Sequence, residues 1–115
     1  MMADCIFCKI ARKEIPVEPL YEDSEVLAFR DIDPKAPTHV LVIPRRHVAS
    51  VASFGPDDAG MAGRLLLAAT GVARAEGLAE RGFRLVVNTG DEGGQTVHHL
   101  HVHVLGGRAM RWPPG

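Results

Sequence analysis

Four of the six histidines in this chain of 115 residues lie in one short segment, residues 97–105. Three of them, His99, His101 and His103, alternate with aliphatic residues, and a period of two is typical of a β-strand. If the segment is extended, the three imidazoles point to one face and the aliphatic side chains to the other, where they can be buried. Side chains two positions apart on a strand lie about 6.5–7 Å apart. One small anion or one metal ion could therefore contact two or three of these imidazoles.

Three kinds of site fit this row of imidazoles. It could be the solvent-facing side of an edge strand, or a metal site, because neutral imidazole is a good ligand for zinc or copper. It could also serve phosphoryl or nucleotidyl transfer, in which one imidazole attacks phosphorus and its neighbours hold charge and protons. A glycine-rich loop, residues 90–96, precedes the row, and its backbone N–H groups could cradle an anion. This loop favours the transfer reaction.

The segment His99–Leu105 resembles the H-φ-H-φ-H-φ-φ signature of the histidine triad (HIT) family, in which φ is an apolar residue. Segments 93–97, 105–108 and 112–115 resemble the Hint branch of that family, the histidine triad nucleotide-binding proteins, which are purine nucleoside phosphoramidases. Further matches lie upstream, at Ile6–Phe7, Lys9–Ile10, Arg12–Pro16, Ala28–Phe29, Asp31–Ile32, Ala36–His39 and Leu41–Pro44. The resemblance covers nearly the whole chain and implies a single HIT domain over residues 1–115.

Composition sets the bounds of the fold and of the partners. A chain of this length, 46% hydrophobic, is expected to form one domain that buries roughly two-thirds of its unfolded surface. Its net charge of −1 offers no broad basic field for nucleic acid or membranes, and no apolar run approaches the ~18 residues of a spanning helix. Residues 1–4 lack the pattern of an export signal. We expect a cytoplasmic protein with a small soluble ligand.

The elements predict an α+β fold, a meandering antiparallel sheet with one short N-terminal helix and one long helix. The short helix spans residues 5–12, with Asp4 as its N-cap and Pro16 after its end. Strands are expected over residues 25–30, 38–44, 83–88 and 97–105, with a short extended piece at 20–21. The proline-rich connector between the strands 25–30 and 38–44 is too short for a crossover helix, so these two strands should be antiparallel.

The long helix is expected to open at residues 55–58, where proline and two acids suit a first turn, and to end at Gly77. Its apolar residues recur at helical spacing, at Met61, Leu65, Ala68, Ala69, Val72 and Ala73. Such a stripe is more often core or subunit interface than a cofactor site. Three glycines within the helix weaken it, and close approach of another backbone is one explanation for them.

Cys5 and Cys8 are the only cysteines, and their C-x-x-C spacing has two interpretations. They could line the short helix, or they could form half of a zinc site. The family resemblance implies that His47 and His99 would complete a closed Cys₂His₂ site. No cofactor is otherwise expected.

The family resemblance also implies a nucleotide site. A carboxylate at Asp31 only accepts hydrogen bonds and suits a ribose diol, although a turn-capping aspartate is the alternative. Asn88 would donate to a phosphate oxygen, unless it is only a turn residue. The implied nucleotide-binding residues are Phe7, Phe29, Asp31, Ile32, Asn88, Gly94, Gln95, Thr96, Val97, His101 and His103.

The predicted reaction is a two-step nucleotidyl transfer to water. His101 attacks the α-phosphorus of an adenosine or guanosine 5′-phosphoramidate, the amine leaves, and water hydrolyses the nucleotidyl-histidine. Among the three imidazoles, only His101 has one on each side. His103 would hold the phosphate, in the protonated form, while His99 would orient the other ring nitrogen of His101 through the backbone. The family match for His39 is a buried partner of His99 that fixes its tautomer.

Gln95 and Thr96 would place donors on the phosphate, and Thr96 would help to protonate the leaving nitrogen. The catalytic set is thus His101, His99, His103, His39 and Thr96. Two positions depart from the commonest family pattern: Thr96 stands where serine is usual, and His98 where tyrosine is usual.

Two other functions stay open. One is hydrolysis of diadenosine polyphosphates, as in the Fhit branch, against which the C-terminal segment 112–115 argues. The other is a non-enzymatic nucleotide- or metal-binding adaptor. The apolar helix stripe, the resemblance and the C-terminal tail also predict a homodimer in which Trp112 lies near the partner's site.

Overall fold

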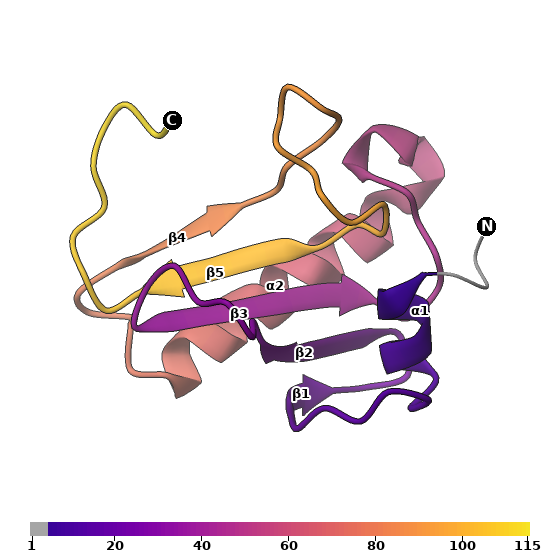
Figure 1. Cartoon of the computed structure of the whole chain (residues 1–115), viewed down its shortest axis with the longest axis horizontal. Coiled ribbons are helices and arrows are strands. Elements are labelled where there is room, and N and C mark those ends of the chain that lie inside the picture. The colour runs from indigo at the N-terminus through magenta and orange to yellow at the C-terminus, as the bar shows by residue number, and fades with distance from the viewer. Residues whose placement is uncertain (1–4) are drawn as a thin grey trace.

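The computed structural model describes residues 5–115 (Figure 1), so the expected N-cap at Asp4 lies outside the described residues. In chain order the elements are α1 (Ile6–Ala11), β1 (Pro19–Glu22), β2 (Val26–Arg30), β3 (Thr38–Pro44), the 3₁₀ turns η2 (Val51–Ser53) and η3 (Pro56–Asp58), α2 (Ala59–Ala75), β4 (Phe83–Val86) and β5 (Val102–Gly106). The five strands form one sheet in the order β1-β2-β3-β5-β4, and every neighbouring pair is antiparallel. The predicted α+β fold is confirmed.

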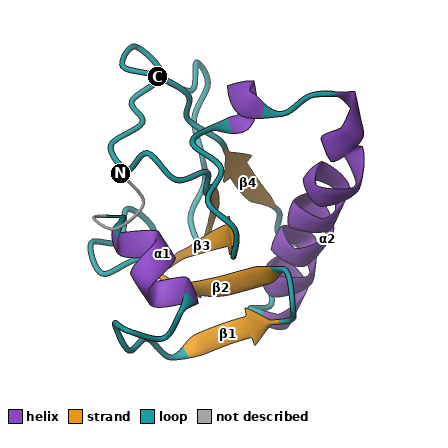
Figure 2. Ribbon diagram, turned by 90° about the vertical axis from the view of Figure 1, so that its right-hand side faces the viewer, coloured by secondary structure: helices purple, strands orange, loops and turns teal. Residues whose placement is uncertain are grey.

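The sheet is covered by α2 on one face and by α1 on the other (Figure 2). Strand β3 shows the division, because Val40 and Val42 belong to the core on the α2 side and Leu41 and Ile43 to the core on the α1 side. Side chains of a strand alternate between its faces, so a strand buried on both faces is apolar throughout. The buried polar residue of β3 is His39, on the α1 side, and this face carries the candidate site.

The histidine segment forms regular strand only from Val102 onward, and residues 97–101 are irregular. Their backbone leaves the sheet ladder, since the N–H of Leu100 donates to the carbonyl of Val48 at 2.7 Å. The alternation survives this change. Leu100 lies in the core on the α2 side, while the rings of the two histidines that flank it contact Phe7 on the α1 side.

Helix α2 packs its predicted apolar stripe on the chain's own sheet. Leu65 and Val72 are buried there, and Met61 and Ala68 pack partly buried against the same core. The stripe is therefore core, so it cannot by itself motivate the predicted homodimer. Leu66 and Leu67 are the exposed apolar residues of this helix, at 51% and 75%. Within residues 5–115 no helix is long and apolar enough to cross a membrane.

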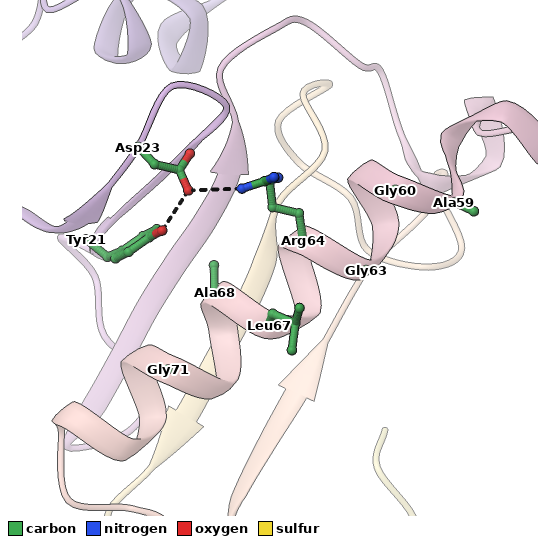
Figure 3. A pocket seen from close by; sticks show the side chains of 9 residues that line it. All are labelled: Tyr21, Asp23, Ala59, Gly60, Gly63, Arg64, Leu67, Ala68 and Gly71. Carbon is green, nitrogen blue, oxygen red and sulfur yellow. Dashed lines mark hydrogen bonds and ion pairs between the residues drawn. The ribbon is translucent and has the colours of Figure 1, made fainter.

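A groove of about 520 Å³ runs beside α2, between the helix and the end of β1 (Figure 3). Three helix glycines line it, and at each an added Cβ would meet no atom within 4 Å: Gly60, Gly63 and Gly71. Within residues 5–115 no other backbone approaches these three glycines, so the explanation suggested for them does not hold inside the chain. The polar groups at its edge satisfy one another, because the Tyr21 hydroxyl donates to Asp23 at 2.6 Å and Arg64 lies 3.6 Å from the same carboxylate oxygen.

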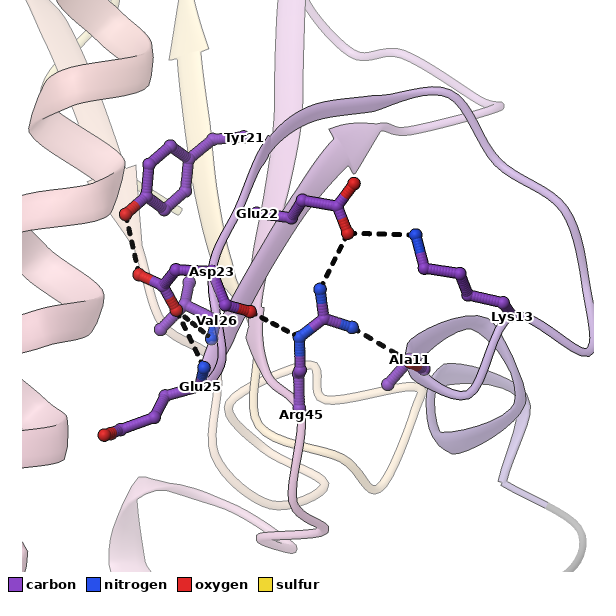
Figure 4. A network of polar contacts seen from close by, with 8 residues as sticks. All are labelled: Ala11, Lys13, Tyr21, Glu22, Asp23, Glu25, Val26 and Arg45. Atoms are coloured by element: carbon purple, nitrogen blue, oxygen red, sulfur yellow. Dashed lines mark hydrogen bonds and ion pairs between the residues drawn. The ribbon is translucent and has the colours of Figure 1, made fainter.

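Arg45, just after β3, ties α1 to the sheet (Figure 4). Its guanidinium donates to the carbonyls of Ala11, at 3.0 Å, and Asp23, at 2.6 Å. It also donates to the Glu22 carboxylate at 2.8 Å, which accepts a second bond from Lys13 at 3.0 Å. The end of α1 and the end of β1 thus share one side chain.

We expect Arg45→Leu to lower the free energy of unfolding by about 1.5–3 kcal/mol, because it leaves two backbone carbonyls without a charged donor. Urea unfolding at fixed pH measures the change. Arg12→Leu is the control: Arg12 is half-exposed and contacts Glu14, two residues away, so its loss should cost less than about 0.5 kcal/mol. Equal stability of the two variants would contradict this prediction.

Candidate active site

The ring of His101 is buried and held in one tautomer. Its Nδ1 lies 2.7 Å from the carbonyl oxygen of His99. A carbonyl only accepts, so Nδ1 carries the hydrogen and Nε2 keeps the lone pair of a nucleophile. The ring has His103 on one side, with centroids 4.9 Å apart, and the edge of Phe7 on another, at 5.2 Å. The expected imidazole on both sides is therefore wrong, because the second neighbour is a phenyl ring.

His39 contacts His103, not His99 as expected. The backbone N–H of Lys35 donates to His39 Nδ1 at 3.0 Å, so the hydrogen of His39 lies on Nε2. This Nε2–H faces Nδ1 of His103 at 2.9 Å, which leaves the His103 hydrogen on Nε2. His103 Nε2 is buried and has no hydrogen-bond partner within residues 5–115. The chain of contacts thus supplies a directed donor beside the lone pair of His101.

Burial, together with the nearby rings of His101 and His39, lowers the pKa of His103 to about 4. The ring is then neutral near pH 7, in contrast to the protonated form expected on a phosphate. Burial also lowers the pKa of His39, opposed by the charge of Asp31, whose carboxylate lies 3.4 Å from its Nε2. A neutral His103 still donates through Nε2–H, and an anion bound there would favour the charged form.

The lowered pKa of His103 makes stability depend on pH. The unfolded ring titrates near 6.5 and the folded ring near 4. Between these values the unfolded chain binds more protons than the folded chain. The free energy of unfolding should therefore decrease as the pH is lowered, by up to about 2 kcal/mol from pH 7 to pH 5. Urea unfolding at both pH values should show a smaller fall for His103→Gln than for wild type. His98→Gln, at an exposed position, is the control, and an unchanged fall in His103→Gln would refute the assignment.

Gln95 organises the glycine loop instead of offering donors to a phosphate. Its side-chain amide donates to the carbonyls of Ala49, at 2.7 Å, and Val97, at 3.0 Å. Its oxygen accepts from the N–H of Gly90, and its own backbone N–H donates back to the Gly90 carbonyl. Both amide hydrogens are thus engaged, and the predicted role of this side chain is corrected. The amide carries no free donor for a ligand.

The rest of the loop leaves other groups accessible. The side chains of Thr96, exposed, and Asn88, half-buried, make no hydrogen bond within the part of the chain that the structure describes. Gly94 has a φ of +82°, a conformation that favours glycine, and its N–H donates to the Asp91 carbonyl at 3.0 Å. At Gly93 an added Cβ would overlap the carbonyl oxygen of Thr89. The turn therefore needs glycine at both positions.

The predicted nucleoside-binding residues lie on the α1 side of the sheet. Phe7 and Phe29 are buried, with ring centroids 5.7 Å apart in an edge-to-face arrangement. Asp31 caps a turn through Oδ1, which accepts the N–H of Asp33 at 2.8 Å, while Oδ2 faces His39. Ile32 is fully exposed. Val97 packs against the core on the α1 side. Oδ2 of Asp31, which accepts no backbone N–H, could accept from a ligand.

The four residues proposed from the sequence as metal ligands come together in one cluster. Their donor atoms lie within 4.8 Å of one another. Nδ1 of His99 lies 3.3 Å from Sγ of Cys5 and 3.5 Å from Sγ of Cys8, and Nδ1 of His47 lies 3.3 Å from Sγ of Cys8. His99 Nε2 donates to the Pro44 carbonyl at 2.8 Å, which leaves the Nδ1 lone pair directed at the sulfurs. We name these four residues the Cys₂His₂ cluster.

The Cys8 thiol of the Cys₂His₂ cluster is protonated near neutral pH. Burial, together with the neighbouring Cys5, raises the pKa of Cys8 to about 11. A divalent cation among the four donors would instead favour deprotonated thiols, because it attracts thiolates directly. Two thiols and two imidazoles are the donor set that zinc prefers in closed sites. The residues therefore fit a zinc ion.

Comparison with known proteins decides the family. The model of the HIT domain matches residues 12–110. The chain belongs to the HIT family. An uncharacterized HIT-like protein of Synechococcus elongatus is 51% identical over 115 residues, which is all of both chains. This HIT domain is also similar to the HIT family hydrolase of Legionella pneumophila Philadelphia 1, with 52% identity, a TM-score of 0.95, and 97% of this chain and 100% of that chain covered.

Two further solved structures resemble this HIT domain. The HIT family hydrolase of Clostridium thermocellum is 46% identical, with a TM-score of 0.91, and 94% of each chain is covered. A histidine triad protein of Clostridium difficile is 42% identical, with a TM-score of 0.90 and the same coverage. At these identities the likeness covers both the fold and the sequence. It supports the assignment of the site to the family's histidine motif.

Two contacts of this HIT domain could not be found from its residue types. The N–H of Lys35 fixes the tautomer of His39, and the carbonyl of Pro44 fixes that of His99. Both are backbone groups, which every non-proline residue carries as a donor and every residue carries as an acceptor. Only their placement beside an imidazole gives them a role, so no sequence signal marks them.

Proposed function

We propose that this HIT protein is a nucleotidyl hydrolase that cleaves purine nucleoside 5′-phosphoramidates to the nucleoside monophosphate and an amine. The observation that supports it most is the pair of opposite tautomers at the site. His101 has a free lone pair at Nε2, and the neighbouring His103 has a free hydrogen at Nε2. A nucleophile and a donor for a phosphoryl oxygen are thereby adjacent and already oriented, which suits in-line displacement at phosphorus.

In the first step, Nε2 of His101 forms a bond to the α-phosphorus and the P–N bond to the amine breaks. The leaving nitrogen takes a proton from the Thr96 hydroxyl, which water can replenish. The adduct carries a positive charge on the His101 ring, and the His99 carbonyl, as acceptor of its Nδ1–H, stabilises that charge. Water then attacks phosphorus, the N–P bond breaks, and His101 recovers its lone pair.

Binding of the nucleotide would use groups that the chain leaves unpaired. The Nε2–H of His103 and the carboxamide of Asn88 would donate to the non-bridging oxygens of the α-phosphate. Oδ2 of Asp31 would accept from a ribose hydroxyl, and the two phenyl rings of Phe7 and Phe29 would border the base. The small net charge of the chain suits one such ligand better than a polyanion.

Turnover of an adenosine 5′-phosphoramidate and of a diadenosine polyphosphate by purified protein tests this proposal. We expect hydrolysis of the phosphoramidate at a higher kcat/KM than the polyphosphate. A preference for the polyphosphate would instead identify a hydrolase of the Fhit type. Binding of adenosine monophosphate with turnover of neither compound would identify an adaptor, and either result would overturn the proposal.

We also propose that the Cys₂His₂ cluster holds one structural zinc ion. The mutual distances and the donor set carry this proposal. The ion would join α1, through the two cysteines, to the segments that bear His47 and His99. The cluster lies next to the proposed nucleophile in sequence, because His99 is two residues before His101. Because the chain supplies all four ligands, a zinc ion would take no part in substrate binding. It would hold the N-terminal helix against the site.

A homodimer remains a proposal on grounds other than the helix stripe. Strand β4 is an edge of the sheet, its side chains are only half-buried, and Val87 just after it is 38% exposed. An edge strand offers unpaired N–H and C=O groups to a second copy. Trp112 is 82% exposed, which is unusual for the largest side chain. Sedimentation of the protein at micromolar concentration should show a dimer, and a monomer would refute this proposal.

A further inference from the structure

We propose that His99 and Phe7 are positioning residues for His101, and that the Cys₂His₂ cluster holds both of them in place. This inference rests on the nucleotidyl hydrolase proposed above. It assigns to the cluster an effect on the rate of the reaction in addition to an effect on folding. Two separate lines of contact join the cluster to the ring of His101.

The first line runs through His99. Three polar groups of His99 have three different partners. Its ring Nδ1 faces the sulfurs, its ring Nε2 donates to the Pro44 carbonyl, and its backbone carbonyl accepts from His101. The side chain is fully buried. A shift of the ring towards or away from the sulfurs therefore moves the acceptor that selects the tautomer of His101. Without that acceptor, the hydrogen of His101 could occupy Nε2 and block the lone pair.

The second line runs through α1. Phe7 lies in the sequence between the two cysteines, and the N–H of Cys8 donates to Sγ of Cys5 at 3.3 Å in the first turn of this helix. The Phe7 ring meets the rings of His99 and His101 edge to face, with centroids 5.9 and 5.2 Å apart. Metal binding by the four residues of the cluster would thus fix the position of the Phe7 ring, which packs against the ring of His101.

The helix packs its apolar face on the sheet through Phe7, Ile10 and Ala11, and its polar anchors are few. Helix α1 has six residues, which is too short for a helix to be stable alone. Its described polar anchors are the Arg45 bond to its last residue, Ala11, and the contacts of the cluster at its first turn. A displacement near 1 Å of a reacting group can cost on the order of 10²-fold in rate. Loosening the first turn is therefore expected to reduce turnover well before the fold is lost.

The variant that tests this inference is His47→Gln, which removes a ligand that lies outside α1 and makes no bond to His101; its ring contacts that of His99, with centroids 5.1 Å apart. We expect it to lose bound metal, to lower kcat by about 10- to 100-fold, and to change KM by less than about twofold. The second readout is ¹⁵N NMR of histidine-labelled protein at pH 8, which distinguishes Nδ1–H from Nε2–H. Wild type loaded with zinc should show one tautomer at His101, and His47→Gln a mixture.

The matched control is Val72→Ala, which opens a cavity in the core on the α2 side of the sheet, whereas α1 packs in the core on the other side. It should lower stability while kcat and the NMR signature stay at the wild-type level. Should His47→Gln not fold, Phe7→Leu keeps all four ligands and is expected to lower kcat by about 10-fold with zinc still bound. An effect of Phe7→Leu on KM alone would refute its positioning role.

The inference is overturned if His47→Gln has lost its metal and yet retains both kcat and the single tautomer of His101. The NMR readout needs no substrate. If wild type hydrolyses no phosphoramidate but the His101 tautomer still depends on the cluster, the proposed function fails and the positioning stands. If wild type is active and the tautomer does not depend on the cluster, the positioning fails alone.

Discussion

Replacing His101 with alanine is expected to lower kcat on a nucleoside phosphoramidate by at least ~10²–10⁴-fold and to abolish any nucleotidyl adduct on the protein. The reason is geometric, because the His99 carbonyl holds the Nδ1–H of His101 and leaves its Nε2 lone pair free, and the ring of His103 lies beside it with centroids 4.9 Å apart. Mass spectrometry after a rapid quench without acid, with a labelled substrate, would map the adduct to a peptide. The adduct should appear on His101 in wild type and be missing in His101→Ala.

Two further variants sharpen this experiment. His103→Ala should slow formation of the adduct but leave its attachment site intact, because in the proposed mechanism His103 donates to the phosphate and forms no bond to phosphorus. His98→Ala, at an exposed position, is the control and should keep most of the activity. An adduct mapped to His99 or His103, or turnover by His101→Ala near the wild-type rate, would overturn the assignment.

Replacing Cys8 with serine is expected to remove zinc binding and the stability that depends on it. A ligand that binds only the folded state at 100–1,000 times its Kd adds roughly 3–4 kcal/mol to the free energy of unfolding. Cys8 is buried between Cys5, His47 and His99, so its loss leaves an incomplete set of ligands. Metal analysis should find one zinc per wild-type chain and well under one per Cys8→Ser chain.

The chelator experiment separates zinc binding from packing at Cys8. A strong chelator should lower the urea midpoint of wild type and leave that of Cys8→Ser unchanged, because the variant has no metal to lose. Arg12→Leu, near the cluster in sequence but not part of it, should respond to the chelator as wild type does. Wild-type protein with well under one zinc per chain, unaffected by added zinc, would remove the zinc proposal.

Local patterns in the sequence were enough to predict the fold. Strand β3 spans Thr38–Pro44 as expected, because a run of apolar residues bounded by prolines has few other conformations. The antiparallel pairing of β2 with β3 also follows from the short connector between them. Element ends are less local: β5 begins at Val102, since the bonds of the preceding backbone go to a loop 52 residues away in sequence, at Val48.

The chemistry of the site divides in the same way. The alternation of histidines and aliphatic residues was sufficient to predict which side chains are buried on the α2 side and which face the site. It could not predict where each ring points, because a strand's period defines a face and leaves the side-chain rotation open. The partner of His39 is accordingly His103, and the ring of His99 turns to the cysteines.

The tautomers, finally, depend on groups that residue types do not reveal. Whether Nε2 of an imidazole holds a hydrogen or a lone pair depends on the partner of the other nitrogen. For His101 that partner is the backbone carbonyl two residues before it, and for His39 it is the backbone N–H four residues before it; the shape of the folded chain brings each to the ring. The amino-acid sequence thus determined that a row of histidines would lie beside a glycine loop in an α+β domain, and it indicated His101 as the attacking ring. The folded backbone decided which ring nitrogens hold hydrogens and which hold lone pairs, because a period of two leaves the rotation of each ring open.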